Sequence, residues 1–225
     1  MRPLSTGCLV RNDWICGEYL RSRRSELQDA LTQHITLTVV AVLVGLAVAV
    51  PLAILARRLH LTQAILGAAT VIYTIPSVAL FSFFIPFTGI SETTVAIGLV
   101  LYSLTVLVRN VVAGLDAVPD DVVEAARGMG MGPTRMMMRV QLPLALPAIM
   151  AGVRIATVST ISLTTVGGII NYGGLGNLIF SGLQTSFRPQ VLVASVLCVV
   201  LAITADLALL GVQRVITPWQ RVATR

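Results

Sequence analysis

The sequence of 225 residues contains no lysine, so all 16 of its basic residues are arginines. This absence excludes two kinds of enzyme. A phosphate-binding loop that hydrolyses ATP places a lysine on the phosphates, and a pyridoxal phosphate enzyme needs a lysine for its Schiff base. Neither site can be built from this chain.

Charged residues of both signs are scarce. They make up 12% of the chain, whereas hydrophobic residues make up 56%, and the mean hydropathy is +0.87. A soluble globular domain needs roughly a quarter of its residues charged to remain solvated. The composition therefore predicts an integral membrane protein.

Histidine and cysteine are too few and too scattered to suggest a metal site. The chain has His34, His60, Cys8, Cys16 and Cys198. Cys198 lies in an apolar run and is expected to be a packing residue, whereas the first two cysteines can pair only if they face an oxidising compartment. The net charge of +6 does not indicate nucleic acid, because the arginines flank apolar runs instead of forming one stripe.

Five apolar runs are long enough to cross a membrane, since a hydrocarbon core of about 30 Å needs about 20 helical residues. These runs cover residues 36–56, 64–87, 93–112, 147–170 and 191–211. The sequence therefore predicts an all-α, polytopic membrane protein with about five transmembrane helices. Prolines inside the first two runs are expected to be tolerated, as they are in many membrane helices.

The arginines alternate between the connections of these spans. Arg57 and Arg58 follow the first span, no arginine separates the second from the third, and three arginines lie between the third and the fourth. The positive-inside rule then places the first and third connections and the C-terminus in the cytoplasm, and the N-terminus outside. Five arginines precede the first span and oppose this last assignment. A helix over 15–33 that lies flat on the membrane is the mildest interpretation.

Three parts follow from this pattern. Residues 1–34 form an N-terminal segment that is extracytoplasmic or interfacial. Residues 35–219 form the transmembrane domain, which includes a cytoplasmic loop over 116–143, and residues 220–225 form a cytoplasmic tail. In the loop, Pro119 and the acidic residues after it predict a short helix. Glycines end that helix, and Pro133 predicts a second one that runs into the fourth span.

The loop has the spacing of one known motif. It resembles the EAA loop of ABC importer permeases, whose pattern, E-A-A-x3-G-x9-I-x-L-P, defines seven positions. Six of them match, at Glu124, Ala125, Ala126, Gly130, Leu142 and Pro143, and the only departure is Val140 in place of isoleucine. The chain thus resembles the permeases of binding-protein-dependent importers, and the resemblance implies a type I ABC importer permease fold.

In that family the loop docks into a groove on the ATP-hydrolysing subunit. Small alanines permit close approach, Gly130 permits a sharp bend, and methionines supply a deformable apolar surface. Arg127, Met131 and Arg135 would belong to the same coupling surface. Burial of each methionine against the chain's own spans is an equally good interpretation.

Further stretches are similar to one branch of the family, the permeases for glycine betaine, carnitine, choline and proline betaine. These stretches are 73–80 (YTIPSVAL), 108–115, 142–154, the Gly-Gly-Leu-Gly of 173–176, and Thr217 with Pro218. Asn171 and Tyr172 stand where the family more often has Gly-Ala. Methionine permeases share the EAA and Gly-Gly-Leu-Gly features, so an importer of methionine or another amino acid with the same architecture is an alternative.

The resemblance implies a transport subunit and not an enzyme. Its partners would be two ATP-binding subunits, a second permease chain, identical or paralogous, and an extracytoplasmic substrate-binding protein. ATP and magnesium would bind the partner ATPase, and this chain would bind no cofactor. The location implied is the bacterial inner membrane. An ATP-independent transporter or channel subunit is the other alternative, although no acidic or histidine relay lies at mid-membrane to couple protons.

Several residues within the spans could line a translocation path or form a gate. They are Tyr73, Pro76, Asn110, Ser159, Thr164, Asn171, Gly173 and Gly174. Small polar residues also mediate helix packing and tyrosines anchor at interfaces, so both interpretations stay open. Arg109, Arg154 and Asp206 are charged residues within or near spans. Structural roles are expected for all three, with the arginines reaching the cytoplasmic interface.

Overall fold

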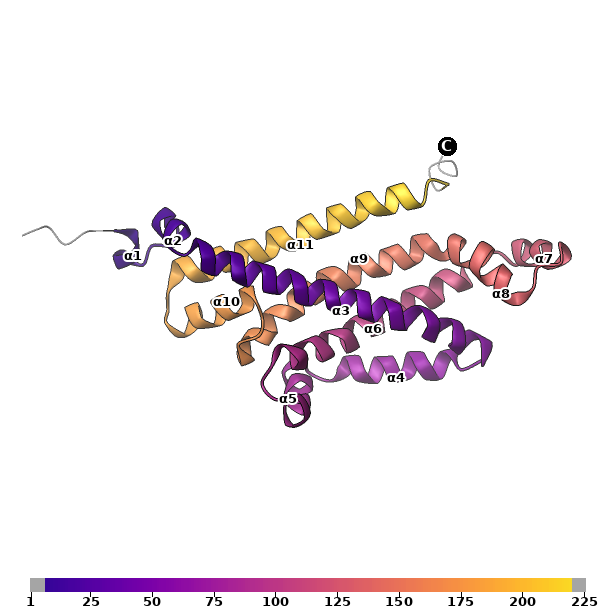
Figure 1. The fold of residues 1–225 in the computed structure, drawn as a ribbon, viewed down its shortest axis with the longest axis horizontal. Helices are drawn as coiled ribbons and strands as arrows, with labels where there is room; N and C mark the ends of the chain where they lie inside the picture. Colours follow the sequence, from indigo (N-terminus) through magenta and orange to yellow (C-terminus); the bar gives the residue numbers. More distant parts are fainter. Residues whose placement is uncertain (1–6, 220–225) are drawn as a thin grey trace, which may run out of the picture. The chain divides into compact units, whose positions relative to one another are not determined.

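The computed structural model describes residues 7–219, and helices make up most of that range (Figure 1). No strand occurs among these residues. The predicted tail over 220–225 lies outside them. Four segments are long and apolar enough to cross a membrane: α3 (Arg24–Arg58), α6 (Glu92–Asp116), Pro133–Ile170 and α11 (Arg188–Ile216). The predicted class, an all-α polytopic membrane protein, is confirmed.

The second predicted span, 64–87, consists of two helices. Helix α4 (Thr62–Thr74) and helix α5 (Ser77–Thr88) are bent by 93° at the break that contains Pro76. Proline has no N–H to continue a helix, and it disfavours helical dihedral angles at the residue before it. The expectation that this proline is tolerated inside one span helix is therefore wrong, whereas Pro51 does lie inside α3. With the bent pair counted as one broken span, five spans remain.

A single helix over 15–33 is also wrong. Helix α2 (Gly17–Ser22) is followed by Arg23, whose φ of −112° and ψ of 22° leave the helical region. Helix α3 starts at the next residue and continues for 35 residues. Because no glycine or proline occurs between 24 and 44, no residue with a strong helix-breaking tendency separates this segment from the first predicted span.

The chain forms two compact units. The first contains the residues up to Ala41 together with Ile75–Leu99 and Val158–Thr204, and the second contains Val42–Thr74, Val100–Thr157 and the residues from Ala205 on. Helices α3, α6 and α11, and α9 (Leu142–Val166), each contribute to both units. The chain passes between the units five times, so the two ends of the described chain belong to different units.

The core of the second unit is aliphatic and closely packed. It is centred on residues of α6, including Leu107, Val111 and Leu115, which are at most 1% exposed. Helices come close where glycine faces a neighbour. A Cβ atom at Gly114 would lie 2.9 Å from the carbonyl oxygen of Ala145 on α9. Small residues at such contacts are typical of membrane helices, where van der Waals packing drives association.

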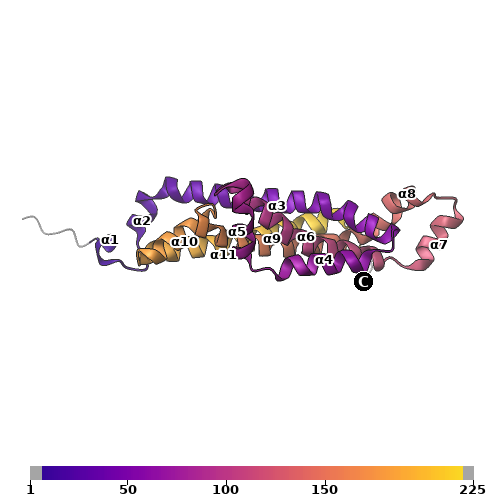
Figure 2. The ribbon, with the colours of Figure 1, turned by 90° about the horizontal axis from the view of Figure 1, so that it is seen from below.

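The first unit contains the N-terminal helices α1 (Cys8–Arg11) and α2, and also α10 (Leu175–Gln184). Figure 2 shows these helices at the same end of the unit. Tyr19 of α2 and Leu178 of α10 belong to one buried cluster. The N-terminal segment therefore packs against helices that follow it by more than 150 residues.

Candidate functional site

The predicted coupling loop is built from two helices of the second unit. Helix α7 (Asp120–Gly128) follows Pro119 and carries two aspartates in its first turn, where the positive end of the helix dipole favours carboxylates. Helix α8 (Pro133–Met136) continues through a π-helical turn, Met137–Gln141, into α9. The two short helices predicted from the prolines and glycines of the loop are confirmed.

Gly130 ends α7 in a conformation that suits glycine. Its φ is +74°, its N–H donates to the carbonyl of Arg127 at 2.9 Å, and the N–H of Met131 donates to the carbonyl of Ala126 at 3.2 Å. This pair of hydrogen bonds is the Schellman arrangement, which satisfies the last carbonyls of a helix and requires a left-handed residue. The left-handed conformation at the end of α7 therefore explains why glycine suits this position of the EAA pattern.

Three of the seven motif positions, all before the second short helix, are exposed. The exposed motif and flanking residues are Glu124, Ala125, Arg127, Gly130 and Arg135, and the half-buried ones are Met131, Leu142 and Pro143. Ala126 is 2% exposed, so this position of α7 is covered by other residues of the chain. Within residues 7–219, no carboxylate pairs with Arg127 or Arg135, and no arginine or histidine pairs with Glu124. The loop thus presents charged groups without ionic partners from the described part of this chain.

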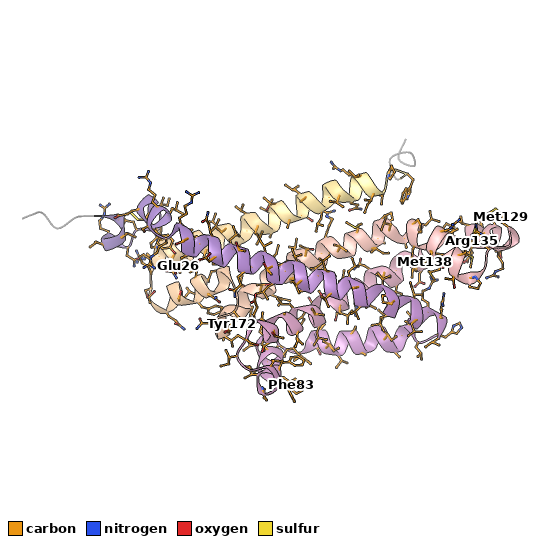
Figure 3. All side chains as sticks on the ribbon, in the orientation of Figure 1. Glu26, Phe83, Met129, Arg135, Met138 and Tyr172 are labelled. Carbon is orange, nitrogen blue, oxygen red and sulfur yellow. A yellow bond between two sulfur atoms is a disulfide. The ribbon has the colours of Figure 1, made fainter. Side chains whose placement is uncertain are left out.

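The loop methionines divide into two groups. Met129 and Met138 are 71% and 61% exposed, whereas Met137 is 9% exposed and belongs to the core cluster. Figure 3 shows Met129, Met138 and Arg135 on the loop that joins α6 to α9. Met137 is therefore buried against the chain's own helices, as the alternative interpretation expected. Met129 and Met138 are exposed and accessible to a partner.

Two of the candidate path residues line a cavity of about 380 Å³ in the second unit. Its walls are Thr70, Tyr73, Thr105, Val106, Arg109 and Asn110. The Tyr73 ring meets the ring of Tyr102 edge to face, with centroids 5.7 Å apart. The amide nitrogen of Asn110 donates to its own helix, at the carbonyl of Val106, at 2.9 Å.

Three other path candidates lie in one turn of the first unit. The turn follows α9 and a 3-10 helix, Gly167–Ile170, and includes Asn171 with a φ of +63° and Gly174 with a φ of +56°. The N–H of Gly173 donates to the side-chain oxygen of Asn177 at 2.8 Å, whose amide nitrogen donates to the Asn171 carbonyl at 3.0 Å. This network fixes the shape of the turn.

His34 of α3 supports this turn, and the sequence did not single it out. It is fully buried, and its Nε2 lies 3.0 Å from the carbonyl oxygen of Ile161 on α9. A Cβ atom at Gly174 would lie 2.7 Å from both the backbone nitrogen and the Cβ of His34. The neighbouring Gln33 accepts a hydrogen bond of 3.2 Å from the N–H of Gly174. The sequence signal that could have identified these residues is the polar pair Gln33 and His34, which lies just before the first apolar run.

The other three path candidates, Pro76, Ser159 and Thr164, belong neither to the cavity lining nor to the hydrogen-bonded turn. Thr164 is fully buried and its hydroxyl donates to the carbonyl of Thr160 within α9 at 2.8 Å. Ser159 is half-buried on the same helix, and Pro76 marks the break between α4 and α5. Thr164 therefore satisfies its hydroxyl locally, as small polar residues that serve helix packing do.

Two of the three charged span residues form an ion pair that the sequence did not predict. The guanidinium of Arg154 on α9 donates two hydrogen bonds, of 2.8 and 2.9 Å, to the carboxylate of Asp206 on α11. A second pair joins the ends of two helices, because Arg57 of α3 lies 3.1 Å from Asp116 of α6. Arg109 instead donates to the hydroxyl of Thr70 at 2.6 Å.

A disulfide joins Cys8 and Cys16, a pairing that the sequence had left open. Inside this loop Asn12 donates to the carbonyl of Ser186 at 2.8 Å and accepts from the N–H of Arg188 at 2.9 Å. The disulfide loop is thereby attached to the turn between α10 and α11. Glu18 also lies close to the two sulfur atoms, but disulfide-bonded sulfur is not a thiolate ligand for a metal.

Comparison with known proteins identifies relatives along most of the chain. It is 36% identical over 203 residues to the choline transport system permease protein OpuBB of Bacillus subtilis, covering 89% of this chain and 93% of that one. It is 35% identical over 206 residues to the osmoprotectant import permease protein OsmW of Salmonella typhimurium, covering 89% and 96%.

Among solved structures, the chain is similar to the MetNI methionine ABC transporter in an inward-facing conformation. The TM-score is 0.80 over 87% of this chain and 98% of that one, at 22% sequence identity. This likeness concerns the fold, which is that of a type I ABC importer permease. The profile of one family, the binding-protein-dependent transport system inner membrane component, matches residues 41–222. With that match and these relatives, the chain belongs to the family of inner-membrane components of binding-protein-dependent transport systems, and is a multi-pass membrane protein.

Proposed function

We propose that the chain is the permease subunit of an ATP-driven importer of osmoprotectants, which include glycine betaine, choline, carnitine and proline betaine. The observation that carries this proposal is the similarity to osmoprotectant permeases, at 30 to 36% identity over 83 to 92% of the chain. The fold and the exposed EAA loop support the same class of transporter.

The loop formed by α7 and α8 is the surface that docks on the ATP-binding subunit. Its motif exposes Glu124, Arg127 and Arg135 without ionic partners in the described chain, and Met129 adds an exposed apolar side chain. Methionine-rich, deformable surfaces are well suited to a partner that changes conformation. Closure of the ATP-bound subunits moves this loop and switches the permease between inward-open and outward-open states.

The complete transporter contains two ATP-binding subunits, two permease chains and an extracytoplasmic substrate-binding protein. ATP and magnesium bind the ATP-binding subunits, so this chain catalyses no reaction and holds no cofactor of its own. Quaternary ammonium groups bind best in cages of aromatic rings. Because aromatic residues are only 5% of this chain, the high-affinity site belongs to the binding protein.

The chain crosses the bacterial inner membrane with its C-terminus in the cytoplasm and its N-terminus outside. The arginine pattern supports this orientation. The Cys8–Cys16 disulfide supports it independently, because disulfides persist in oxidising compartments.

The proposal is tested by isolation of the intact complex. The tagged chain is purified from its own cells in mild detergent, co-purified subunits are identified by mass spectrometry, and ATP hydrolysis is measured with and without the binding protein loaded with glycine betaine. A co-purified ATP-binding subunit whose hydrolysis rate rises with the loaded binding protein is the expected result. A well-folded preparation without an ATPase would contradict the proposal.

A further inference from the structure

Arg109 differs from the other arginine inside the spans because it lacks a counter-ion. Arg154 is neutralised by Asp206, whereas the guanidinium of Arg109 bonds only the neutral hydroxyl of Thr70 among the described residues. A guanidinium has five N–H donors, so most of its capacity remains unused. Arg109 is exposed on the helix surface, and an ionisable residue within a membrane-spanning helix is a default candidate for function.

The residues around Arg109 form a cavity whose lining is mainly apolar and contains several polar groups. Thr70 and Tyr73 lie three residues apart on α4, and Thr105 and Arg109 lie four apart on α6, so each pair shares one helix face. These four residues and Asn110 line the volume of about 380 Å³. This is within the range of small-molecule sites, which begin at about 300 Å³.

The same cavity offers an aromatic wall. Tyr73 is 49% exposed, and its ring is held edge to face against the buried ring of Tyr102 at 5.7 Å. The face of a tyrosine ring attracts a quaternary ammonium group. The Tyr73 ring therefore suits a cation, and the guanidinium of Arg109 in the same lining suits a carboxylate, which it can bind through two parallel hydrogen bonds.

We propose that this cavity is a subsite for a small zwitterion, whose carboxylate binds Arg109 and whose quaternary ammonium lies against Tyr73. The inference rests on the proposed function and deepens it, because it assigns the recognition of the carboxylate to the permease itself. Glycine betaine and carnitine carry both groups, whereas choline carries the ammonium alone. The subsite therefore distinguishes the zwitterions from choline.

The first experiment compares solutes in proteoliposomes that contain the complete transporter. Initial ATP-dependent uptake of glycine betaine and choline is measured for the wild type, Arg109→Gln, Arg109→Lys and the control Arg58→Gln, an exposed arginine at the end of α3. Loss of a charge-paired contact worth about 1.4 kcal/mol lowers the rate about tenfold. We expect Arg109→Gln to lower the ratio of glycine betaine to choline uptake by this factor, Arg109→Lys to lower it less, and the control to leave it unchanged.

Equal losses for both solutes, or no loss, would overturn the inference. An equal loss is what a guanidinium bound to a lipid phosphate would give, since it serves every solute alike. Transport of neither solute by the wild type would instead contradict the proposed function.

A second experiment does not depend on transport. Thr105→Cys in a Cys198→Ala background is labelled, in the purified complex, with a trimethylammonium methanethiosulfonate reagent. Glycine betaine is expected to slow labelling at least several-fold more than choline does, and Arg109→Gln is expected to remove this difference. Labelling rates that respond equally to both solutes would refute the subsite even if the complex transports osmoprotectants.

Discussion

Arg154 of α9 and Asp206 of α11, 52 residues apart in the sequence, form a two-point ion pair at 2.8 and 2.9 Å. Helix α11 is otherwise sparingly packed, since only 6% of its most apolar window is buried within the chain. The pair is therefore a specific polar contact that fixes α11 against α9 within the second unit. It also allows both charged side chains to lie in membrane-spanning helices, because each neutralises the other.

Removal of one partner of this pair is expected to lower stability. Asp206→Asn leaves Arg154 without a counter-ion, so the melting temperature of the detergent-purified chain should fall. The double variant Arg154→Met with Asp206→Leu should recover most of the loss, because apolar replacement of both partners removes the unpaired charge. The measurement is thermal unfolding of the wild type, Asp206→Asn and the double variant. A double variant less stable than Asp206→Asn would contradict the stabilising role of the ion pair.

Gly130 is expected to accept asparagine but not valine. Its φ of +74° costs a β-branched residue about 1–2 kcal/mol, whereas asparagine already occupies such conformations in this chain at Asn12 and Asn171. Apart from its immediate chain neighbours, a Cβ atom at Gly130 would meet no atom within 4 Å, so the cost comes from the local backbone conformation and not from packing. Binding of the ATP-binding subunit, measured by pull-down, should survive Gly130→Asn and weaken with Gly130→Val.

Charge at the same position provides a matched test of docking. Gly130→Asp has nearly the shape of Gly130→Asn, and aspartate also tolerates the left-handed conformation. If the loop lies in a groove of the partner, the added carboxylate should weaken the pull-down more than the amide does, with equal melting temperatures. Identical pull-down of the two variants would argue against docking at Gly130.

The loop methionines should separate docking from folding. Replacement of exposed Met129 and Met138 by glutamine is expected to leave the melting temperature unchanged and to reduce ATP hydrolysis stimulated by the binding protein. Replacement of Met137, which lies in the core cluster, by alanine should destabilise the chain by about 2–5 kcal/mol. Equal effects of both changes on stability would show that the exposed methionines also support the fold.

The disulfide predicts which side of the membrane the N-terminus faces. In spheroplasts, a membrane-impermeant maleimide should label Cys8 and Cys16 only after treatment with an impermeant reductant from outside. Cys198, which lies in α11, should remain unlabelled and serves as the internal control. Labelling of the N-terminal cysteines that requires permeabilised membranes would place the N-terminus in the cytoplasm.

Local patterns predicted the elements that depend on local chemistry. The apolar runs located the spans, and the prolines and glycines around Pro119 and Pro133 located the two loop helices. The misjudged elements are also informative. Pro51 lies inside α3, whereas Pro76 separates α4 from α5. Both prolines lack the N–H that continues a helix, but whether the helix continues depends on neighbouring helices, which the local sequence does not specify.

Contacts between segments that are distant in the sequence could not be predicted from it. The pairing of Arg154 with Asp206, and the burial of His34 beside Gly174, depend on how helices far apart in the chain pack together. The candidate path residues were chosen by residue type alone, so the structure could gather Tyr73 with Asn110 while giving Thr164 a partner in its own helix. The residue that proved most informative in the cavity, Arg109, was expected to be only structural.

The central claim, osmoprotectant import, is tested most directly by uptake in proteoliposomes that contain the permease, its ATP-binding subunits and its binding protein. Uptake of labelled glycine betaine, choline and carnitine is measured with ATP inside the vesicles, and methionine is the competing control. We predict ATP-dependent uptake of at least one osmoprotectant, blocked by an excess of the unlabelled compound and unaffected by methionine. Uptake that is inhibited by methionine alone, or that proceeds without ATP, would contradict the account.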